Sequence, residues 1–257
     1  MQLLTLALLI VGLCAVYALV GVAIVRRFMK PHVREGHNDV LVPLFLMAGT
    51  LYAVLLGFLV IAVWENYGAA KDNAAEEAST LTTLYRQTNG MPPAEQATMR
   101  GLLRDYTEAV VTKEWSIQAA TGGASPVARK ALGDMYRTFA TLKPSVASSS
   151  ISKAFLSTLA SVADDRNRRT LQAGESLPGI IWAGVLIGGA IVIAMTFIVF
   201  MERPLPHIIA SVLMASLIGT LLLMMTLLDR PFTGPLALSS DAFEHSMSVY
   251  AAVDGGN

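Results

Sequence analysis

Charged residues are scarce in this sequence of 257 residues. They make up 15% of it, whereas hydrophobic residues make up 54% and the mean hydropathy is +0.54. Because soluble domains carry about 25% charged residues, this scarcity argues against an ordinary soluble domain or a disordered chain and favours a membrane protein. The 19 Lys plus Arg balance 19 Asp plus Glu, so the sequence has no basic excess for binding nucleic acid.

Cysteine and catalytic motifs are also missing. The single cysteine, Cys14, can form neither an intrachain disulfide nor a cysteine metal cluster. The sequence has no His-Glu-x-x-His, phosphate-binding Gly-Lys-Ser/Thr, Gly-x-Ser-x-Gly or Cys-x-x-Cys motif. Its four histidines are scattered over loops and termini, which does not suit a preorganised metal site. We therefore expect no enzyme activity, no cofactor and no metal site.

Four long apolar runs lack any Asp, Glu, Lys or Arg. They cover about residues 3–25, 40–64, 179–201 and 207–228. Each is long enough to cross the ~30 Å hydrocarbon core of a bilayer as a helix. The first run has no basic segment before it and is too long for a signal peptide, so we expect it to be retained. These runs predict an all-α integral membrane protein with two pairs of transmembrane helices, in residues 1–64 and 179–228.

The polar part of the chain lies between the second and third runs. Residues 65–178 hold 25 of the 38 charged residues, and their apolar positions recur every three or four residues. This period indicates helices that are buried on one side. We therefore expect residues 65–178 to form a helical domain outside the membrane, and residues 229–257 to form a C-terminal tail with a short amphipathic helix.

Glycine and proline positions predict the helix ends. Neither residue occurs between Gly68 and Gly90, so the second span should continue beyond the membrane as one helix of roughly 45 residues until Asn89-Gly90 and Pro92-Pro93 end it. A second amphipathic helix should end at Gly122-Gly123. Ser125 before Pro126 is typical of a helix start, and Pro144 with the serines at 148–150 marks a further break.

Basic residues predict the orientation in the membrane. Arg26, Arg27, Lys30 and Arg34 follow the first span, and positively charged loops tend to stay in the cytoplasm. The N-terminus, the helical domain and the C-terminus are then expected on the extracytoplasmic side of a plasma or inner membrane. Three arginines at 166–169 argue against this orientation, but long segments translocate largely regardless of charge.

Small residues at four-residue spacing mark one face on each of three spans. Such faces let helix backbones approach closely where lipid supplies no hydrophobic gain. They serve either packing inside one four-helix protomer or packing between protomers around a pore, and the pattern does not choose between the two. These residues are Gly49, Ala53 and Gly57, then Gly184 and Gly188, then Ser211, Ala215 and Gly219.

Uncharged residues inside the spans and charges at their borders are candidates for a pore. Proton-coupled transporters usually keep an ionisable group in the membrane, whereas a passive channel can be built from small, hydroxylated and apolar rings. The structural alternatives are hydroxyls bonded to the preceding helical turn and charges in the headgroup layer. Farther along, Glu76 and Glu77 are expected on a solvated helix face. The pore-lining or pore-mouth candidates are Thr50, Tyr52, Phe58, Glu65, Asp229 and Arg230.

Several of these residues belong to a pattern that resembles the bestrophin-like domain family, a group of uncharacterised four-span membrane proteins. The resemblance covers about residues 49–243. Its most specific parts are Leu177-Pro178 with Trp182, and Leu228-Asp229-Arg230-Pro231-Phe232 with Gly234. The other matching positions are Leu55-Leu56-Gly57-Phe58, Trp64 with Tyr67, Glu77, Leu84-Tyr85-Arg86, Tyr106, Glu114-Trp115, and Arg166 with Arg169.

These family positions have physical interpretations as scaffold. Pro178 suits the first turn of the third span. Pro231 cannot continue the fourth helix, so the chain should turn at the membrane surface, with Phe232 as an interfacial anchor. Arg166 and Arg169 share one helical face, and their carboxylate partner is expected among Glu65, Glu76, Glu77 and Asp229.

The resemblance also suggests a function. The family name points to bestrophins, which are pentameric anion channels gated by calcium with a largely cytosolic helical body. The predicted topology departs from that arrangement, and the sequence shows no match to the bestrophin neck or calcium clasp. We expect an oligomeric ion channel lined by its second span, with the lipid bilayer, further copies of the chain and inorganic ions as partners. The alternative is a non-conducting scaffold or sensor whose outer helices bind a partner.

Overall fold

The computed structural model describes residues 2–28, 37–142, 149–199 and 201–255, and within these ranges the regular structure is helical and includes no strand. The chain forms two compact units. We call Met1–Glu65 with Ser176–Asp229 the membrane unit, and Asn66–Glu175 with Arg230–Asn257 the helical unit. The predicted all-α fold is confirmed. Four residues with a predicted role lie outside the described residues: Lys30, Arg34, Pro144 and Ser148.

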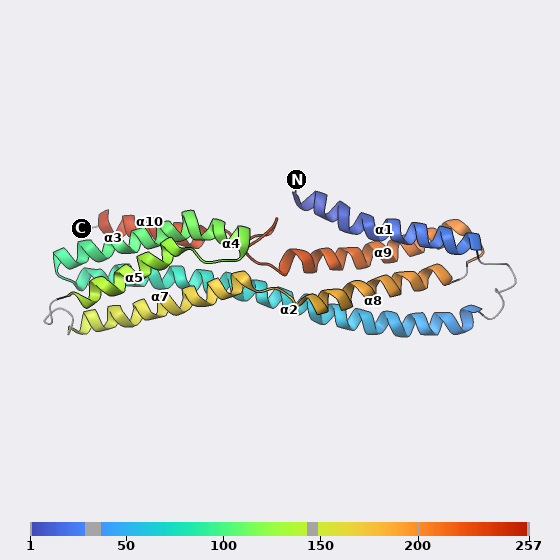
Figure 1. Cartoon of the computed structure of the whole chain (residues 1–257), viewed down its shortest axis with the longest axis horizontal. Coiled ribbons are helices and arrows are strands. Elements are labelled where there is room, and N and C mark those ends of the chain that lie inside the picture. The colour runs from blue at the N-terminus through green and yellow to red at the C-terminus, as the bar shows by residue number, and fades with distance from the viewer. Residues whose placement is uncertain (1, 29–36, 143–148, 200, 256–257) are drawn as a thin grey trace. The chain divides into compact units, whose positions relative to one another are not determined.

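The described residues of the membrane unit form four helices that are long and apolar enough to span a bilayer. In this unit α1 packs along α9 and α8 (Figure 1). The four predicted spans are therefore confirmed, with ends that differ by a few residues. The spans belong to α1 (Gln2–Phe28), α2 (His37–Gln87), α8 (Gly179–Ile198) and α9 (Pro204–Leu228).

One uninterrupted helix, α2, contributes residues to both units. It has 51 residues, close to the predicted length. The short 3-10 turn η2 (Thr88–Gly90) ends it, and α3 (Pro93–Ala109) begins on the second of two prolines. Proline suits this place because the first amides of a helix have no intrahelical partner to lose.

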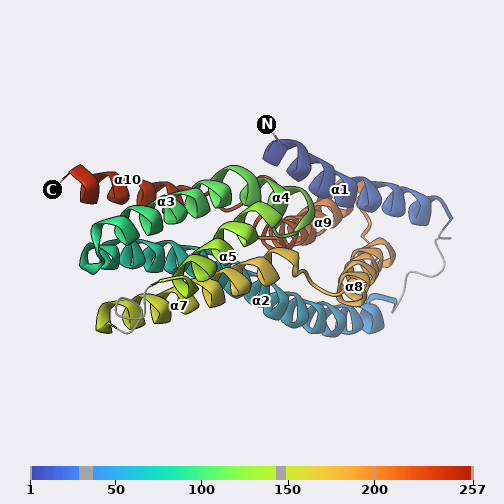
Figure 2. The same cartoon turned by 60° about the vertical axis from the view of Figure 1, so that its left-hand side comes forward.

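In the described residues of the helical unit, five further helices and one π-helical turn lie about the second part of α2 (Figure 2). Its core buries side chains from all of the long helices, including Leu81, Leu103, Met135, Phe155 and Tyr250. These elements are α3, η3 (Val110–Glu114), α4 (Trp115–Thr121), α5 (Pro126–Ala140), α7 (Ser150–Gly174) and α10 (Asp241–Gly255).

Serine caps begin two of these helices. At the start of α5, the Ser125 hydroxyl accepts a hydrogen bond from the amide of Val127 at 3.1 Å. At the start of α7, the Ser149 hydroxyl accepts one from the amide of Ser152 at 3.1 Å. Each satisfies an amide that has no intrahelical acceptor. The predicted start near Ser125 is therefore confirmed.

Gly122 ends α4 in the left-handed conformation, with φ of +67°. A Cβ atom there would lie 2.6 Å from the carbonyl oxygen of Ala173, so both the backbone conformation and the close approach favour glycine. The predicted helix end is correct. The π-helical turn that divides α3 from α4 was not predicted.

Candidate functional site

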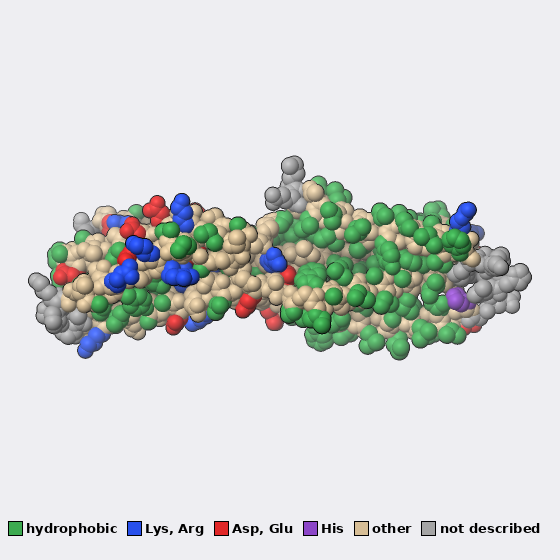
Figure 3. Space-filling model, in the orientation of Figure 1, with side chains coloured by type: hydrophobic (Ala, Val, Ile, Leu, Met, Phe, Trp, Pro, Cys, Tyr) green, Lys and Arg blue, Asp and Glu red, His purple; other side chains and the backbone are tan. Residues whose placement is uncertain are grey.

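In the membrane unit, α2 is much more exposed than a core helix. Among residues 37–65, all of which the structure describes, only Tyr52, Leu56 and Val63 are buried. Exposed hydrophobic side chains such as Leu51 and Phe58 cover the rest of its surface. Figure 3 shows hydrophobic side chains covering the visible face of this unit, with few charges. Lipid or further protein must therefore surround most of α2.

Two glycines in the membrane part of α2 have open space where a side chain would begin. A Cβ atom added to Gly49 or Gly57 would meet no heavy atom within 4 Å, and Ala53 between them is exposed. Gly184 on α8 is open in the same way. We call Gly49, Ala53 and Gly57 the open face of α2. Packing within one protomer does not account for the small residues on this face.

The small residues of α9 are in a different situation. Ser211, Ala215 and Gly219 are buried, and a Cβ atom on Gly219 would lie 3.1 Å from the Cα atom of Val11 on α1. On α8, a Cβ atom on Gly188 would lie 3.0 Å from the ring of Tyr52. These residues let helices approach closely inside the protomer, which is one of the two alternatives left by the sequence.

The polar pore candidates point in different directions. Thr50 is exposed and donates to the carbonyl of Leu46 at 2.8 Å, and Phe58 is exposed. Tyr52 turns inward and donates to the carbonyl of Val185 on α8 at 3.1 Å. Hydroxyl bonding to the preceding turn recurs at Thr220 and elsewhere. Lining of a pore by Thr50 and Phe58 stays a prediction.

The charged border residues also differ. Glu65 and Arg230 are exposed, but Asp229 is buried. Its Oδ1 accepts a hydrogen bond from the amide of Leu177 at 2.7 Å, and its Oδ2 accepts one from the indole Nε1–H of Trp182 at 3.2 Å. A carboxylate is stabilised at the N-terminus of a helix by free amides and the helix dipole. The two most specific parts of the family pattern thus meet at the start of α8, directly after Pro178.

The prediction for Phe232 is wrong, because its ring is buried and not at an interface. Only 2% of Phe232 is exposed, and the ring packs edge-on against Trp115 with a centroid distance of 5.5 Å. The Trp115 indole donates to the carbonyl of Leu238 at 2.8 Å. Pro231 is buried beside Phe232, and Gly234 adopts φ of +80°. These residues fold the segment after α9 into the helical unit.

A buried ionic network forms the polar centre of the helical unit. Arg169 on α7 is fully buried. Its Nε donates to Glu77 Oε2 at 2.7 Å, its Nη2 to Glu77 Oε1 at 3.1 Å and to Glu114 Oε1 at 2.9 Å, and its Nη1 to Gln118 Oε1 at 3.0 Å. Arg169 thus binds Glu77 through two parallel hydrogen bonds, which is the geometry that a guanidinium prefers with a carboxylate.

Three further groups complete the ionic network. Arg166 Nη2 donates to Glu114 Oε2 at 2.6 Å, and the amide of Ser125 donates to the same oxygen at 2.9 Å. The Tyr106 hydroxyl donates to Glu77 Oε1 at 2.6 Å. Two cations and two anions therefore balance in the core. Together they join α2, α3, η3, α4, the start of α5 and α7.

Burial and charge determine the protonation of this network. Burial alone would lower the pKa of Arg169, but the adjacent Glu77 carboxylate, with Tyr106 and Glu114, raises it above its ordinary value. Burial and the Glu77 charge raise the pKa of Tyr106 well above its ordinary value. Arg169 therefore stays charged and Tyr106 stays a neutral donor. We assign the network a structural role, because its charges are matched and buried.

The expected carboxylate partners of Arg166 and Arg169 are partly correct. Of the four candidates, Glu77 is the partner that the structure shows, and its expected place on a solvated face is wrong because the side chain is fully buried. Glu76 is exposed and Asp229 bonds to the start of α8. The second partner, Glu114, was missed.

The π-helical turn η3 explains why Glu114 was missed. It spans Val110–Glu114 and inserts an extra residue between α3 and α4, which shifts the helical phase of everything after it. The turn places Glu114 in the core with Gln118 four residues later. A regular helical period does not predict this placement. The only available signal was the Glu114-Trp115 pair in the family resemblance.

Among the residues that the structure describes, no group of three or more His, Cys, Asp or Glu side chains is arranged to hold a metal ion.

Asp165 on α7 gives a test of electrostatics in the helical unit. Burial, followed by the charge of Glu76, raises its pKa above the ordinary 3.8, and Thr80 Oγ1 donates to its Oδ2 at 3.2 Å. A raised pKa in the folded state means that protonation favours folding: this contribution is complete below 3.8 and is lost as pH rises through the raised pKa. Asp165→Asn stays neutral and can still accept from Thr80. We expect this variant to unfold at a higher temperature than the unchanged protein at neutral pH.

Thermal unfolding followed by circular dichroism at several pH values would measure this effect. The difference between the two proteins should shrink as pH falls through the raised pKa of Asp165, because Asp165 itself then becomes protonated. Asp164→Asn is the matched control, because the neighbouring Asp164 is exposed. A constant difference at every pH, or none, would contradict the explanation.

Known proteins share this sequence pattern and fold. The family model named Bestrophin-like domain matches residues 12–243. The fold is similar to crystal structures of a bacterial bestrophin homologue from Klebsiella pneumoniae. One variant has 14% identity and a TM-score of 0.77 with 99% of each chain covered. Another structure has 13% identity and a TM-score of 0.74, with 96% of this chain and 98% of the other covered. No curated protein matches the sequence. Because the family model matches most of its length, the chain belongs to the Bestrophin-like domain family.

Proposed function

We propose that the protein is an ion channel formed by several copies of this chain, with the membrane part of α2 lining the pore. The observation that carries this proposal is the open face of α2. A helix surrounded by lipid has no need of small residues, whereas a helix that packs closely on another helix does. Gly49 and Ala53 border a cavity against α9, whereas Gly57 is exposed and a Cβ atom on it would meet no atom of the protomer. Contacts from neighbouring copies are therefore proposed at Gly57.

The chemistry of α2 suits passive conduction. Residues 40–64 contain no Asp, Glu, His, Lys or Arg, so an ion crosses past Thr50 and Phe58 and meets Glu65 at the border of the membrane. Hydroxylated and apolar rings of this kind occur in channels, and coupled transport usually needs an intramembrane carboxylate or histidine. The similarity of the fold to bestrophin homologues points to the same class of function.

Ion flux into liposomes that contain the purified protein tests this proposal. We expect flux above that of empty liposomes, and a mass in mild detergent that corresponds to several protomers. Phe58→Ala should change the single-channel conductance, because it removes a large ring from the proposed pore. Leu213→Ala is the matched control, since Leu213 is an equally exposed apolar residue on α9. A monomer without flux would favour the alternative function, a membrane-anchored scaffold or sensor.

The proposed topology places the N-terminus, the helical unit and the C-terminus outside the cytoplasm. Arg26 and Arg27 end α1, and Arg26 Nη1 donates to the carbonyl of Met201 at 3.1 Å. The positive end of α1 and the turn before α9 therefore share one side of the membrane unit. The positive-inside rule assigns that side to the cytoplasm.

Labelling of single cysteines in intact cells would check this topology. In a Cys14→Ala background, a membrane-impermeant maleimide should label Ala119→Cys, an exposed position of the helical unit, without permeabilisation. It should label Arg203→Cys, which is exposed before α9, only after permeabilisation. The reverse pattern would place the helical unit in the cytoplasm.

A further inference from the structure

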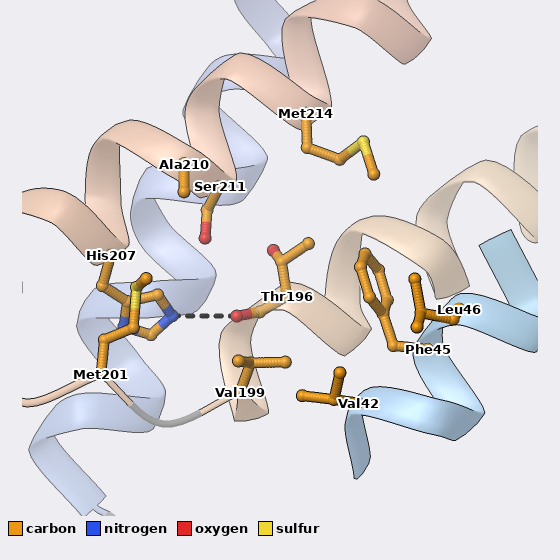
Figure 4. A pocket seen from close by; sticks show the side chains of 10 residues that line it. All are labelled: Val42, Phe45, Leu46, Thr196, Val199, Met201, His207, Ala210, Ser211 and Met214. Atoms are coloured by element: carbon orange, nitrogen blue, oxygen red, sulfur yellow. Dashed lines mark hydrogen bonds between the residues drawn. The ribbon is translucent and has the colours of Figure 1, made fainter. Parts of the chain in front are cut away.

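A long apolar groove lies inside the membrane unit, between α2 on one side and α8 and α9 on the other. Its wider part is a cavity of about 360 Å³ near the starts of α2 and α9 (Figure 4). A second cavity of about 220 Å³ shares Phe45, Leu46 and Met214 with the first and continues it along the same helices. We call the two cavities together the α2–α9 groove.

The length of the α2–α9 groove fits an extended chain-like ligand. Its lining runs from Val42 to Leu56 along α2 and from His207 to Leu221 along α9. At 1.5 Å per residue each wall is about 21 Å long, and the chains of one membrane leaflet fill about 15 Å.

The groove is polar at one end only. Thr196, His207 and Ser211 lie at its wide end, and Figure 4 shows Phe45 of α2 on the opposite side of the cavity from His207 and Ser211 of α9. Toward the other end the lining is apolar apart from Tyr52, whose hydroxyl is bonded to Val185. A ligand that matches this pattern has one polar end and a long hydrocarbon chain.

A positive charge lies at the polar end. Arg26 Nη1 donates to Nδ1 of His207 at 3.3 Å and to the carbonyl of Met201 at 3.1 Å, and both partners line the groove. Because guanidinium can only donate, Nδ1 must accept. The proton of the neutral imidazole is then on Nε2, which donates to the carbonyl of Thr196 at 2.9 Å. The partners that the structure shows for Arg26 are thus uncharged, and its positive charge remains available to an anion.

We infer that the α2–α9 groove binds one acyl chain of an anionic phospholipid, with the lipid phosphate held near Arg26. The apolar walls of the groove bind the hydrocarbon chain. The end near Arg26 binds the charged headgroup, because arginine is a preferred partner of phosphate. A side chain from a second copy would explain the apolar walls but neither their length nor the charge at one end. This inference does not depend on ion conduction.

Native mass spectrometry of the full chain, purified from membranes in mild detergent, tests the inference. We expect one retained phospholipid per protomer, and phosphatidylglycerol should displace phosphatidylcholine when vesicles of each are offered. Ala210→Phe fills the wide end of the groove and should abolish the retained lipid. Leu213→Phe is the matched control on the same helix, because Leu213 is exposed and does not line the groove.

A second variant tests the headgroup site. Arg26→Gln keeps a donor for the carbonyl of Met201 but removes the charge. It should retain a lipid and lose the preference for phosphatidylglycerol. Equal lipid retention by Ala210→Phe and Leu213→Phe would overturn the inference, since the lipid would then be bound at the general surface. A map in which a side chain of another copy fills the groove would also overturn it.

Discussion

Replacing Arg169 by methionine is expected to destabilise the helical unit by about 3–5 kcal/mol, the usual cost of removing one partner from a buried ion pair. Methionine fills a similar volume but removes the guanidinium that pairs with Glu77, while Glu114 keeps its pair with Arg166. Gln118 loses its partner as well. Because a marginally stable domain has a total stability of only about 5–15 kcal/mol, much of the unit should unfold.

Chemical unfolding in mild detergent, followed by circular dichroism and by protease sensitivity, would measure this loss. Arg168→Met is the matched control, because Arg168 is 56% exposed and its pair with Asp165 is 3.7 Å long. We expect a change within about 0.5 kcal/mol for that surface residue. If Arg169→Met and Arg168→Met have the same stability, the ionic network does not hold the unit together.

A double variant separates lost charge balance from lost packing. Adding Glu77→Gln to Arg169→Met leaves Arg166 and Glu114 as a matched pair, and the glutamine oxygen can still accept from Tyr106. Replacing both members of a buried pair is often nearly neutral, whereas removing one is costly. The double variant should therefore be more stable than Arg169→Met alone. An additive further loss would assign the effect to packing.

The helices were predictable because their signals are local. The apolar period, the Asn89-Gly90 turn with its two prolines and the Ser125 cap each act within a few residues, so they predicted α2, α3 and α5. The partner of Arg166 depends instead on a contact between α7 and η3. The π-helical turn η3 shifts the helical phase between α3 and α4, so Glu114 lies on a face that a regular period does not indicate.

The site was less predictable, because one pattern suits two environments. An aromatic residue after a span fits an interface or a core, and the structure buries Phe232. A four-residue repeat of small residues fits contacts inside or between protomers, and the structure separates Gly219 from Gly57. Gly21 was missed altogether. A Cβ atom there would overlap the ring of Phe197, but Tyr17 and Val25, four residues away on each side, do not complete a small-residue pattern.

Gly57→Leu and Gly219→Leu are expected to impair different properties, namely assembly in the first and stability of the fold in the second. Gly219 lies against α1, so its leucine overpacks the protomer, which typically costs about 1–3 kcal/mol. That variant should unfold at a lower temperature. Gly57 has open space, and a leucine in a helix interior is better by up to about 1 kcal/mol than glycine, so its protomer should stay folded. The Gly57 variant should instead lose assembly and ion flux, because the added side chain holds neighbouring α2 helices apart.

The contrast can be measured by thermal unfolding, by mass in mild detergent and by flux into liposomes, with Gly12→Leu as the control. Gly12 lies on α1 and has equally open space, so its leucine tests whether any added bulk on the membrane surface blocks assembly. We expect Gly12→Leu to assemble and conduct like the unchanged protein. If Gly57→Leu does so too, the open face of α2 lies against lipid, and the pore must be sought on another helix or the channel proposal abandoned. If Gly57→Leu alone loses both assembly and flux while its unfolding temperature is unchanged, α2 packs against neighbouring copies.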